Sequence, residues 1–139
     1  MGKGAYVRIA NASGTAVNVG YYGQSCMQPD GTDNSNFGAI TGVVRPGQAL
    51  PASGQPGYIE ADASGSCAFQ PSYFKMNLDI EGSAGGSTTY SFMCTNNTWT
   101  LNDGSSYSTQ TSGGVTVAVT IGLPESGDQY YITVVATDA

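Results

Sequence analysis

Side chains that carry out acid–base chemistry are scarce in this sequence. It has no histidine among its 139 residues, and histidine is the commonest general base and the commonest partner of a serine or cysteine nucleophile. Two carboxylate pairs remain, Glu60 with Asp62 and Asp79 with Glu81, each on one face of an alternating segment. Paired acids can hydrolyse glycosidic bonds, but acids on the wet face of a strand are ordinary. The sequence therefore predicts no catalytic residue and a protein that is not an enzyme.

One short segment has the composition of a metal-binding loop. Asp30, Asp33, Asn34 and Asn36 place carboxylate and amide oxygens at close spacing, and such oxygens are the ligands that calcium prefers. The order of acids found in EF-hands is absent, and Asx-turns explain the same residues without a metal. A metal-free turn is the favoured interpretation, calcium binding is the alternative, and no other cofactor is expected.

The sequence has three cysteines, Cys26, Cys67 and Cys94, which allow at most one internal disulfide. Their spacing fits neither a zinc knuckle nor a redox Cys-x-x-Cys. Buried thiols that behave as small hydrophobic side chains are the first interpretation. A disulfide between Cys67 and Cys94, or between Cys26 and Cys67, is the alternative.

Aromatic residues are the most informative set. The chain has nine tyrosines, four phenylalanines and one tryptophan, although only 10% of its residues are charged. Neighbouring residues on a strand point to opposite faces, so one member of each adjacent aromatic pair should face solvent. A tyrosine combines an apolar ring with a hydroxyl, which suits sugars, lipid headgroups and protein interfaces. The candidate ligand-binding residues are Tyr21, Tyr22, Tyr73, Trp99, Tyr130 and Tyr131, and a core position is the alternative for Trp99.

The elements that position these residues are strands. Apolar residues occupy every second position in 74–80 and again in 115–121, which predicts strands with one buried and one wet face. The last strand, 129–136, is apolar on both faces, which indicates a central position in a sheet or an interface. No segment keeps a 3.6-residue period, so we expect no helix longer than about two turns.

Turn residues separate the strands along the whole chain. The 20 glycines and the Pro, Asn, Asp and Ser clusters supply positive φ or a fixed φ at each turn. We expect about nine or ten short strands, including weaker ones at 6–10, 16–22, 39–44, 57–62, 88–94, 98–101 and 107–111. The predicted fold is all-β, a single antiparallel β-sandwich domain over residues 1–139.

Charge and hydropathy limit the classes of molecule that the protein is expected to bind. The formal net charge is −6, with only four basic residues, which are scattered, so we expect no nucleic-acid binding. No segment approaches the length of a membrane-spanning helix, and the first residues lack the apolar region of a signal peptide. The hydroxyl-rich composition favours an extracellular or surface-acting protein over a cytosolic one.

Three segments resemble the aegerolysins, which are small β-sandwich lipid-binding and pore-forming proteins. The segments 7–19, 44–47 and 97–101 are similar to that family's opening hairpin, its hydrophobic–basic–Pro turn and a late strand. At the place of the family's tryptophan-rich segment this chain has Phe92-Met93-Cys94-Thr95. The resemblance implies binding to membrane lipids and pore formation together with a larger protein partner.

Two hypotheses follow from these observations. The first is a non-enzymatic recognition module, a small toxin or lectin, which binds membrane lipid or glycan through exposed tyrosines. The second is a self-assembling structural subunit of a filament, coat or decoration protein, since low charge weakens repulsion between copies. Aromatic residues gathered at one loop end favour recognition, whereas aromatic residues along a sheet edge or face favour assembly into a homo-oligomer.

Overall fold

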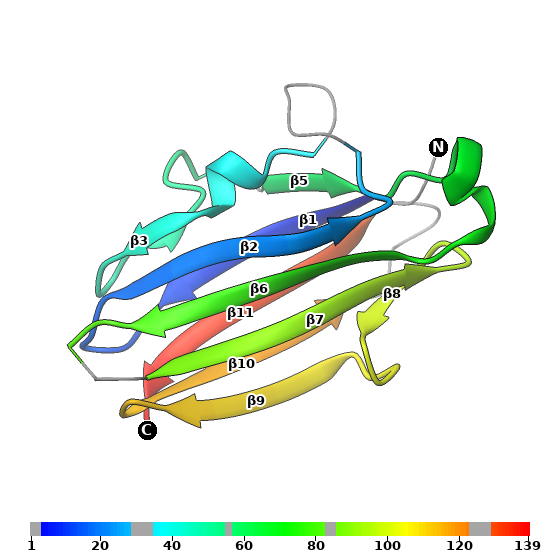
Figure 1. Cartoon of the computed structure of the whole chain (residues 1–139). Coiled ribbons are helices and arrows are strands. Elements are labelled where there is room, and N and C mark those ends of the chain that lie inside the picture. The colour runs from blue at the N-terminus through cyan, green and yellow to red at the C-terminus, as the bar shows by residue number, and fades with distance from the viewer. Residues whose placement is uncertain (1–3, 29–34, 55–56, 83–85, 123–128) are drawn as a thin grey trace.

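Two β-sheets packed face to face form the structure, a computed structural model that describes residues 4–28, 35–54, 57–82, 86–122 and 129–139 (Figure 1). Sheet A has the order β4-β1-β11-β10-β9, with β5 also paired to β1, and sheet B has the order β3-β2-β6-β7-β8. The strands of sheet A are β1 (Gly4–Asn11), β4 (Ala49–Leu50), β5 (Gly57–Glu60), β9 (Tyr107–Ser112), β10 (Val115–Gly122) and β11 (Tyr130–Asp138). The strands of sheet B are β2 (Val17–Ser25), β3 (Gly42–Val44), β6 (Ser72–Ile80), β7 (Ser87–Thr95) and β8 (Thr98–Leu101).

The predicted all-β sandwich is confirmed, with three differences in detail. The described residues form eleven strands rather than nine or ten, because the two-residue β4 pairs with β1. The expected strand over 39–44 is instead the 3-10 helix η1 (Phe37–Ile40) followed by β3, since the side chain of Asn36 caps the helix and accepts from Ala39 N. The sheets are antiparallel except for β1 and β11, which run parallel.

Alternation explains both the strands and the core. On β6 the side chains of Phe74, Met76, Leu78 and Ile80 are buried, as predicted, while Lys75 between them is exposed. The last strand is central in sheet A, because β1 pairs with one edge of β11 and β10 with the other. Its inner side chains are buried, and its outer face is open to solvent along much of its length.

Side chains join the two sheets along the β7–β9 side. The amide of Gln110 on β9 donates to Thr89 O and accepts from Thr89 N on β7, so it satisfies this part of the edge of β7 in place of a strand. Tyr90 on β7 crosses the core and donates its hydroxyl to Val117 O on β10 at 2.7 Å. These contacts leave little of this side open for pairing with a further strand.

β1 and β2 do not form a hairpin. The segment over 7–19, which resembles an opening hairpin, contributes β1 to sheet A and β2 to sheet B, and the two strands do not pair with each other. The chain crosses between the sheets at Asn11–Ala16. Within the described part of the chain, no helix is long or apolar enough to cross a membrane.

Candidate functional site

One end of the sandwich carries a disulfide, and we call it the disulfide end. Cys26 bonds to Cys67, which lies in the 3-10 helix η2 (Gly65–Phe69). The carbonyl of Cys26 also accepts from the hydroxyl of Ser72 at 2.6 Å and from Asp62 N at 2.7 Å. The end of β2, the residues after β5, η2 and the start of β6 are thereby held together. The first interpretation, buried thiols, is therefore wrong for Cys26 and Cys67, which form the alternative disulfide. Cys94 is buried and lies outside the disulfide.

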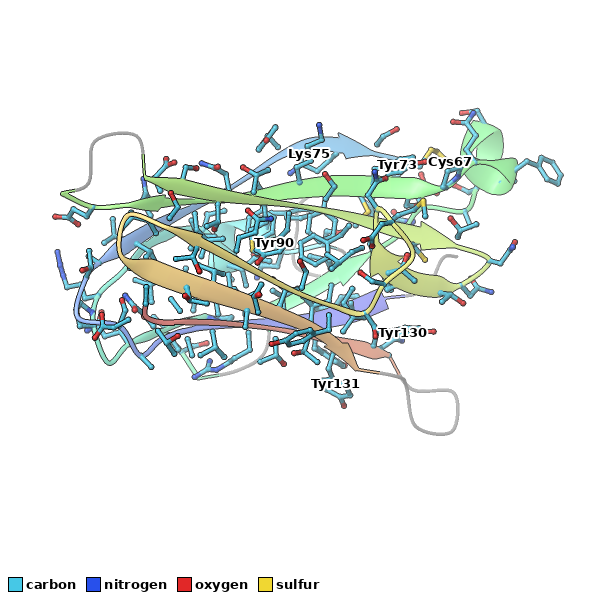
Figure 2. All side chains as sticks on the ribbon, turned by 90° about the horizontal axis from the view of Figure 1, so that it is seen from below. Cys67, Tyr73, Lys75, Tyr90, Tyr130 and Tyr131 are labelled. Carbon is cyan, nitrogen blue, oxygen red and sulfur yellow. A yellow bond between two sulfur atoms is a disulfide. The ribbon has the colours of Figure 1, made fainter. Side chains whose placement is uncertain are left out.

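Exposed aromatic side chains gather at this end. Within the described residues they are Tyr22, Phe69, Tyr107 and Tyr131. Tyr107 and Tyr131 stand at the start of β9 and β11, Tyr22 is near the end of β2, and Phe69 ends η2. Figure 2 shows Tyr73, Tyr130, Tyr131 and Cys67 toward the same end of the molecule. The turns at the opposite end, described below, carry no exposed aromatic residue among those described.

The six predicted ligand-binding residues divide by strand face. Tyr22 is 46% exposed on sheet B and Tyr131 is 47% exposed on sheet A. Tyr73 is half-buried. Tyr21 is partly buried, with its ring packed against the core residues Phe37 and Phe74, and this burial raises its pKa.

Trp99 and Tyr130 are buried members of the core, with exposed fractions of 1% and 5%. Trp99 packs edge-on against Phe74, so the core interpretation of Trp99 is the one that the structure supports. Neither ring presents a face to a surface ligand, and this corrects their place among the candidates. The physical reason is that successive side chains on a strand point to opposite faces, so the exposed residue is the neighbour, Thr98 beside Trp99 and Tyr131 beside Tyr130.

Three tyrosines form a row on the outer face of sheet A, and we call it the tyrosine row. Tyr58 on β5, Tyr6 on β1 and Tyr131 on β11 lie opposite one another in register on three neighbouring strands. The ring centroids of Tyr6 and Tyr58 are 5.4 Å apart, and those of Tyr6 and Tyr131 are 5.6 Å apart. Tilted rings at these separations attract one another. The row therefore offers a preformed aromatic surface across three strands.

Polar groups border the tyrosine row on one side. The hydroxyl of Tyr58 donates to the Glu60 carboxylate, and the ring of Tyr58 covers Gly4, where an added Cβ would collide with it. Gln129, just before β11, accepts from Gly4 N with its side-chain oxygen at 2.8 Å. Burial, together with the hydrogen bond to Glu60, raises the pKa of Tyr58, so its hydroxyl stays a donor at neutral pH.

The rest of the outer face of sheet A has little charge. Arg8 follows Tyr6 on the same face of β1, and its guanidinium donates to Pro51 O at 3.0 Å. Beyond it, the outward positions of β10 and β11 are mainly threonine, alanine and valine. Among the described strand residues that point outward from this sheet, Arg8 and Glu60 are the charged ones. An ionic ligand is therefore disfavoured over most of this face.

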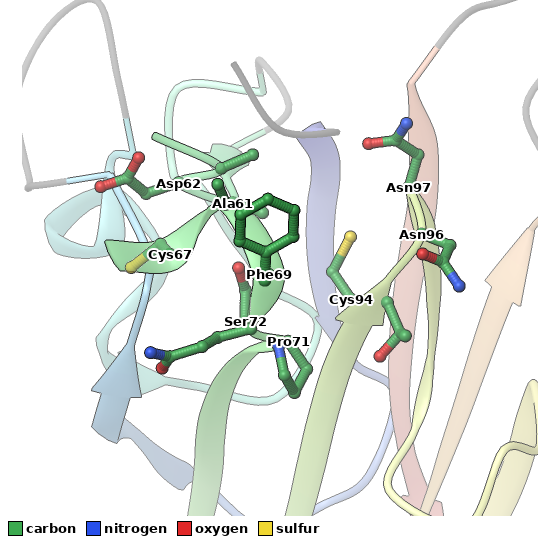
Figure 3. A pocket seen from close by; sticks show the side chains of 13 residues that line it. Ala61, Asp62, Cys67, Phe69, Pro71, Ser72, Cys94, Asn96 and Asn97 are labelled. Atoms are coloured by element: carbon green, nitrogen blue, oxygen red, sulfur yellow. The ribbon is translucent and has the colours of Figure 1, made fainter. Parts of the chain in front are cut away.

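A cleft of about 570 Å³ opens beside η2 (Figure 3). One wall carries Asp62, Phe69 and Gln70, and the other carries Asn96 and Asn97 in the turn between β7 and β8. Both asparagines have positive φ, 52° and 61°, as a two-residue type I′ hairpin turn requires. Ser72 and Cys94, which pair between β6 and β7, line the floor.

A shallower hollow of about 490 Å³ lies on the outer face of sheet B, lined by Tyr73, Lys75 and Ser91 among others. The ammonium of Lys75 is 5.9 Å from the centroid of the Tyr22 ring, a distance at which a cation and a ring face still attract. The register of β2 against β6 shifts between Tyr22 and Ser25, next to this hollow. Lys75 lies on the wet face that the alternation in 74–80 predicts.

Glu60 and Asp62 do not form a shared acidic site. Glu60 is 8% exposed and bonds to Tyr58, whereas Asp62 is exposed and accepts from Ser64 N and Oγ. Glu60 thus points outward from sheet A but is buried, and it is not an ordinary solvent-exposed acid. The Ser64 hydroxyl and N–H together lower the pKa of Asp62.

Only part of the calcium candidate can be placed. Asp30, Asp33 and Asn34 lie outside the described residues, and the side chain of Asn36 caps η1 by accepting from Ala39 N. No group of three or more metal-ligating side chains occurs in the described part of the chain.

Sequence reasoning missed Tyr6, Tyr58 and Phe69. The signal for Tyr6 and Tyr58 was weak, because each alternates with apolar residues without an aromatic neighbour. Their alignment with Tyr131 depends on pairing between strands that are distant in sequence. Phe69 follows Cys67 and Ala68 in a segment without periodicity, and nothing in the sequence marks its 98% exposure.

Comparison with models of known protein families gave no match, and no curated protein matches the chain significantly.

Proposed function

We propose that this protein is a non-enzymatic recognition module that binds neutral glycan chains on the tyrosine row at the disulfide end. The observation that carries the proposal is the alignment of Tyr58, Tyr6 and Tyr131 on three adjacent strands, with ring centroids 5.4 and 5.6 Å apart. A sugar ring has an apolar C–H face, which stacks on an aromatic ring, and hydroxyls at its edge, which need hydrogen-bond partners.

The polar border of the row supplies partners of that kind. Glu60 and Gln129 lie one row away from the rings along the strands, and Arg8 lies on the other side. The rings provide contact area while the side-chain oxygens and the guanidinium fix orientation, which is the usual division of roles in a ligand site. A net charge of −6 and the near absence of basic groups on this face favour a neutral glycan over an anionic one.

Location of the aromatic residues favours recognition over assembly. They gather at one end, around the disulfide, rather than along a whole sheet face or edge. Pairing of the last strand with another copy is disfavoured, because both edges of β11 are already paired. The Cys26–Cys67 disulfide also supports action outside the cytosol, since disulfides persist mainly in oxidising compartments.

A self-assembling structural subunit is the second candidate, and one observation favours it. The outer face of sheet A beyond the tyrosine row is nearly free of charge and rich in threonine, alanine and valine, so two copies can pack through it without strong repulsion.

An array of neutral, acidic and sulfated glycans tests the proposal, with co-sedimentation on phosphatidylcholine, phosphatidylserine and sphingomyelin–cholesterol liposomes as the parallel arm. We expect binding to neutral glycans that weakens when Tyr6 is replaced by alanine. If the array shows no binding but the protein co-sediments with liposomes, the ligand is a membrane lipid rather than a glycan, as the aegerolysin resemblance implies. A blank array together with concentration-dependent growth in light scattering would favour the structural subunit.

A further inference from the structure

We propose that the cleft beside η2 is a second binding site, which takes one or two units of a neutral sugar between Phe69 and the Asn96–Asn97 turn. This site is separate from the tyrosine row, because none of the three row residues lines the cleft. The proposal for the cleft therefore does not depend on glycan binding at the tyrosine row, and each can be tested separately.

Size and rigidity qualify the cleft as a site. Its volume of about 570 Å³ lies within the range of roughly 300–1,000 Å³ typical of small-ligand sites. The wall that carries Phe69 is held by the Cys26–Cys67 disulfide and by the hydrogen bond from Ser72 to Cys26 O. The opposite wall is a tight hairpin turn between paired strands. Little ordering is then required when a ligand enters, and pre-organisation of this kind favours affinity.

Phe69 supplies an apolar contact on the rim. Its side chain is 98% exposed, so a full face of the ring is open to solvent, and Pro71 and three alanines line the cleft near it. Figure 3 shows the ring of Phe69 standing at the wall of the cleft that faces Asn97. A sugar whose C–H face covers this ring would bury apolar surface that is otherwise left in water.

Amide and hydroxyl groups share the lining with that ring, with Asn96 and Asn97 on the wall across from it and Gln70 next to it. Gln70, Asn96 and Asn97 each carry both a donor and an acceptor, and Ser72 and Thr95 add hydroxyls to the lining. Groups that both donate and accept match sugar hydroxyls, which also do both. The composition of the cleft is thus one apolar ring and several two-way hydrogen-bonding groups.

The charges of the lining select against ionic ligands. Asp62 is the charged residue of the lining, so a phosphate, sulfate or uronic acid would meet a negative charge and no cation. Ser64 already satisfies one carboxylate oxygen of Asp62, which leaves the other oxygen for a ligand hydroxyl.

A peptide is a poorer fit than a sugar. An extended peptide is bound most often by addition to an open strand edge, and the floor residues Ser72 and Cys94 are paired with each other between β6 and β7. The floor therefore offers no free edge for a peptide backbone.

Titration of the protein with glucose, galactose, mannose, N-acetylglucosamine, lactose and cellobiose, followed by amide NMR shifts, tests the inference. We expect at least one of these sugars to shift the signals of Phe69, Asn96 and Asn97. Phe69→Ala should then raise Kd about five- to tenfold, whereas Phe69→Tyr, which keeps the ring, should change it less than about twofold. Glucuronic acid should bind more weakly than glucose, because its carboxylate faces Asp62.

Two further variants keep the result interpretable. Asn97→Gly preserves the positive φ of the turn and removes the amide, and it should raise Kd by about two- to tenfold. Tyr22→Ala, which removes an exposed ring outside both the cleft and the tyrosine row, should leave sugar binding in the cleft unchanged. The inference is overturned if no sugar of the panel shifts these signals, if Phe69→Ala binds as tightly as the wild type, or if only a neutral peptide such as tri-alanine produces the shifts. If Tyr6→Ala loses binding on the glycan array while its sugar affinity in the cleft stays the same, the tyrosine row is supported as a glycan site independent of the cleft.

Discussion

The two ends of the sandwich are built from different chemistry. At the disulfide end, the core rings of Phe74, Phe92 and Trp99 pack together, and further aromatic residues reach the surface around them. At the opposite end the core is aliphatic, and the chain crosses between the sheets around Asn11, which is 2% exposed. The first end presents apolar rings to solvent, whereas the second satisfies its polar groups internally.

Asn11 shows how the opposite end is closed. Its amide donates to Thr15 O and Val44 O at 2.8 Å each, and its side-chain oxygen accepts from Ser13 N and Oγ. Both the amide nitrogen and the oxygen of the Asn11 side chain are thereby engaged in two hydrogen bonds each. The polar side chain that closes this end is fully hydrogen-bonded inside the protein, whereas the disulfide end leaves aromatic rings exposed at the surface.

Removal of the disulfide should cause the largest loss of stability at either end. Cys26→Ser together with Cys67→Ser should lower the free energy of unfolding by about 4 kcal/mol, because the bond closes a loop between residues 41 positions apart. Urea unfolding measures the change. Binding at the disulfide end should also weaken under conditions where the variant is still folded, and undiminished binding would show that the disulfide does not position the site.

Asn11→Ala should give the next largest effect, at the opposite end. It leaves buried backbone groups such as Val44 O without a partner, so we expect a loss of about 3 kcal/mol in the free energy of unfolding. Glycan binding per folded molecule should stay unchanged, because the tyrosine row lies at the other end of the sheet. A loss of binding without a loss of stability would contradict this division between the ends.

Tyr90→Phe tests the link between the sheets midway between the two ends. Loss of the hydrogen bond from Tyr90 to Val117 O should cost about 1 kcal/mol. Burial raises the pKa of Tyr90 to about 12, so its contribution is present below the ordinary tyrosine pKa of about 10 and declines as the pH rises toward 12. The stability difference between wild type and variant, measured by denaturant unfolding, should therefore shrink across this interval. A constant difference would mean that Tyr90 titrates normally.

Ser64→Ala should produce the smallest effect, on a single carboxyl of the cleft. The Ser64 hydroxyl donates to Asp62 and is the main reason for its lowered pKa, so the variant should raise that pKa toward the ordinary value. Carboxyl-detected NMR titration measures it. Because the folded-state pKa is depressed, the associated stability is present above the ordinary pKa and is lost as the pH falls. The matched variant is Ser105→Ala, which should affect only Asp103, held by Ser105 in the same way.

Local pattern predicted the scaffold, and non-local pairing determined the site. The period-two segments 74–80 and 115–121 become β6 and β10 with their apolar side chains in the core, because alternation is a property of each strand alone. The tyrosine row needs the registers of β5 with β1 and of β1 with β11. The choice of Cys67 as the partner of Cys26 depends in the same way on which segments meet.

Two differences between the sequence expectations and the structure have local causes. The sequence places Tyr130 and Trp99 among the candidate surface residues, since it does not say which face of a strand is the inner one when both carry apolar or hydroxyl side chains. The sequence indicates only that Glu60 and Asp62 share a face, and the burial of Glu60 depends on Tyr58, which donates to it across the side-chain-free position at Gly4.

A matched pair of surface tyrosines tests the central claim most directly. Tyr131 and Tyr22 are 47% and 46% exposed, but Tyr131 lies in the tyrosine row and Tyr22 lies on the outer face of sheet B. Calorimetric titration with a neutral glycan found on the array should show at least about a tenfold rise in Kd for Tyr131→Ala, equivalent to about 1.4 kcal/mol, and no significant change for Tyr22→Ala. Equal losses in the two variants, or a loss in Tyr22→Ala alone, would contradict the assignment of recognition to the tyrosine row.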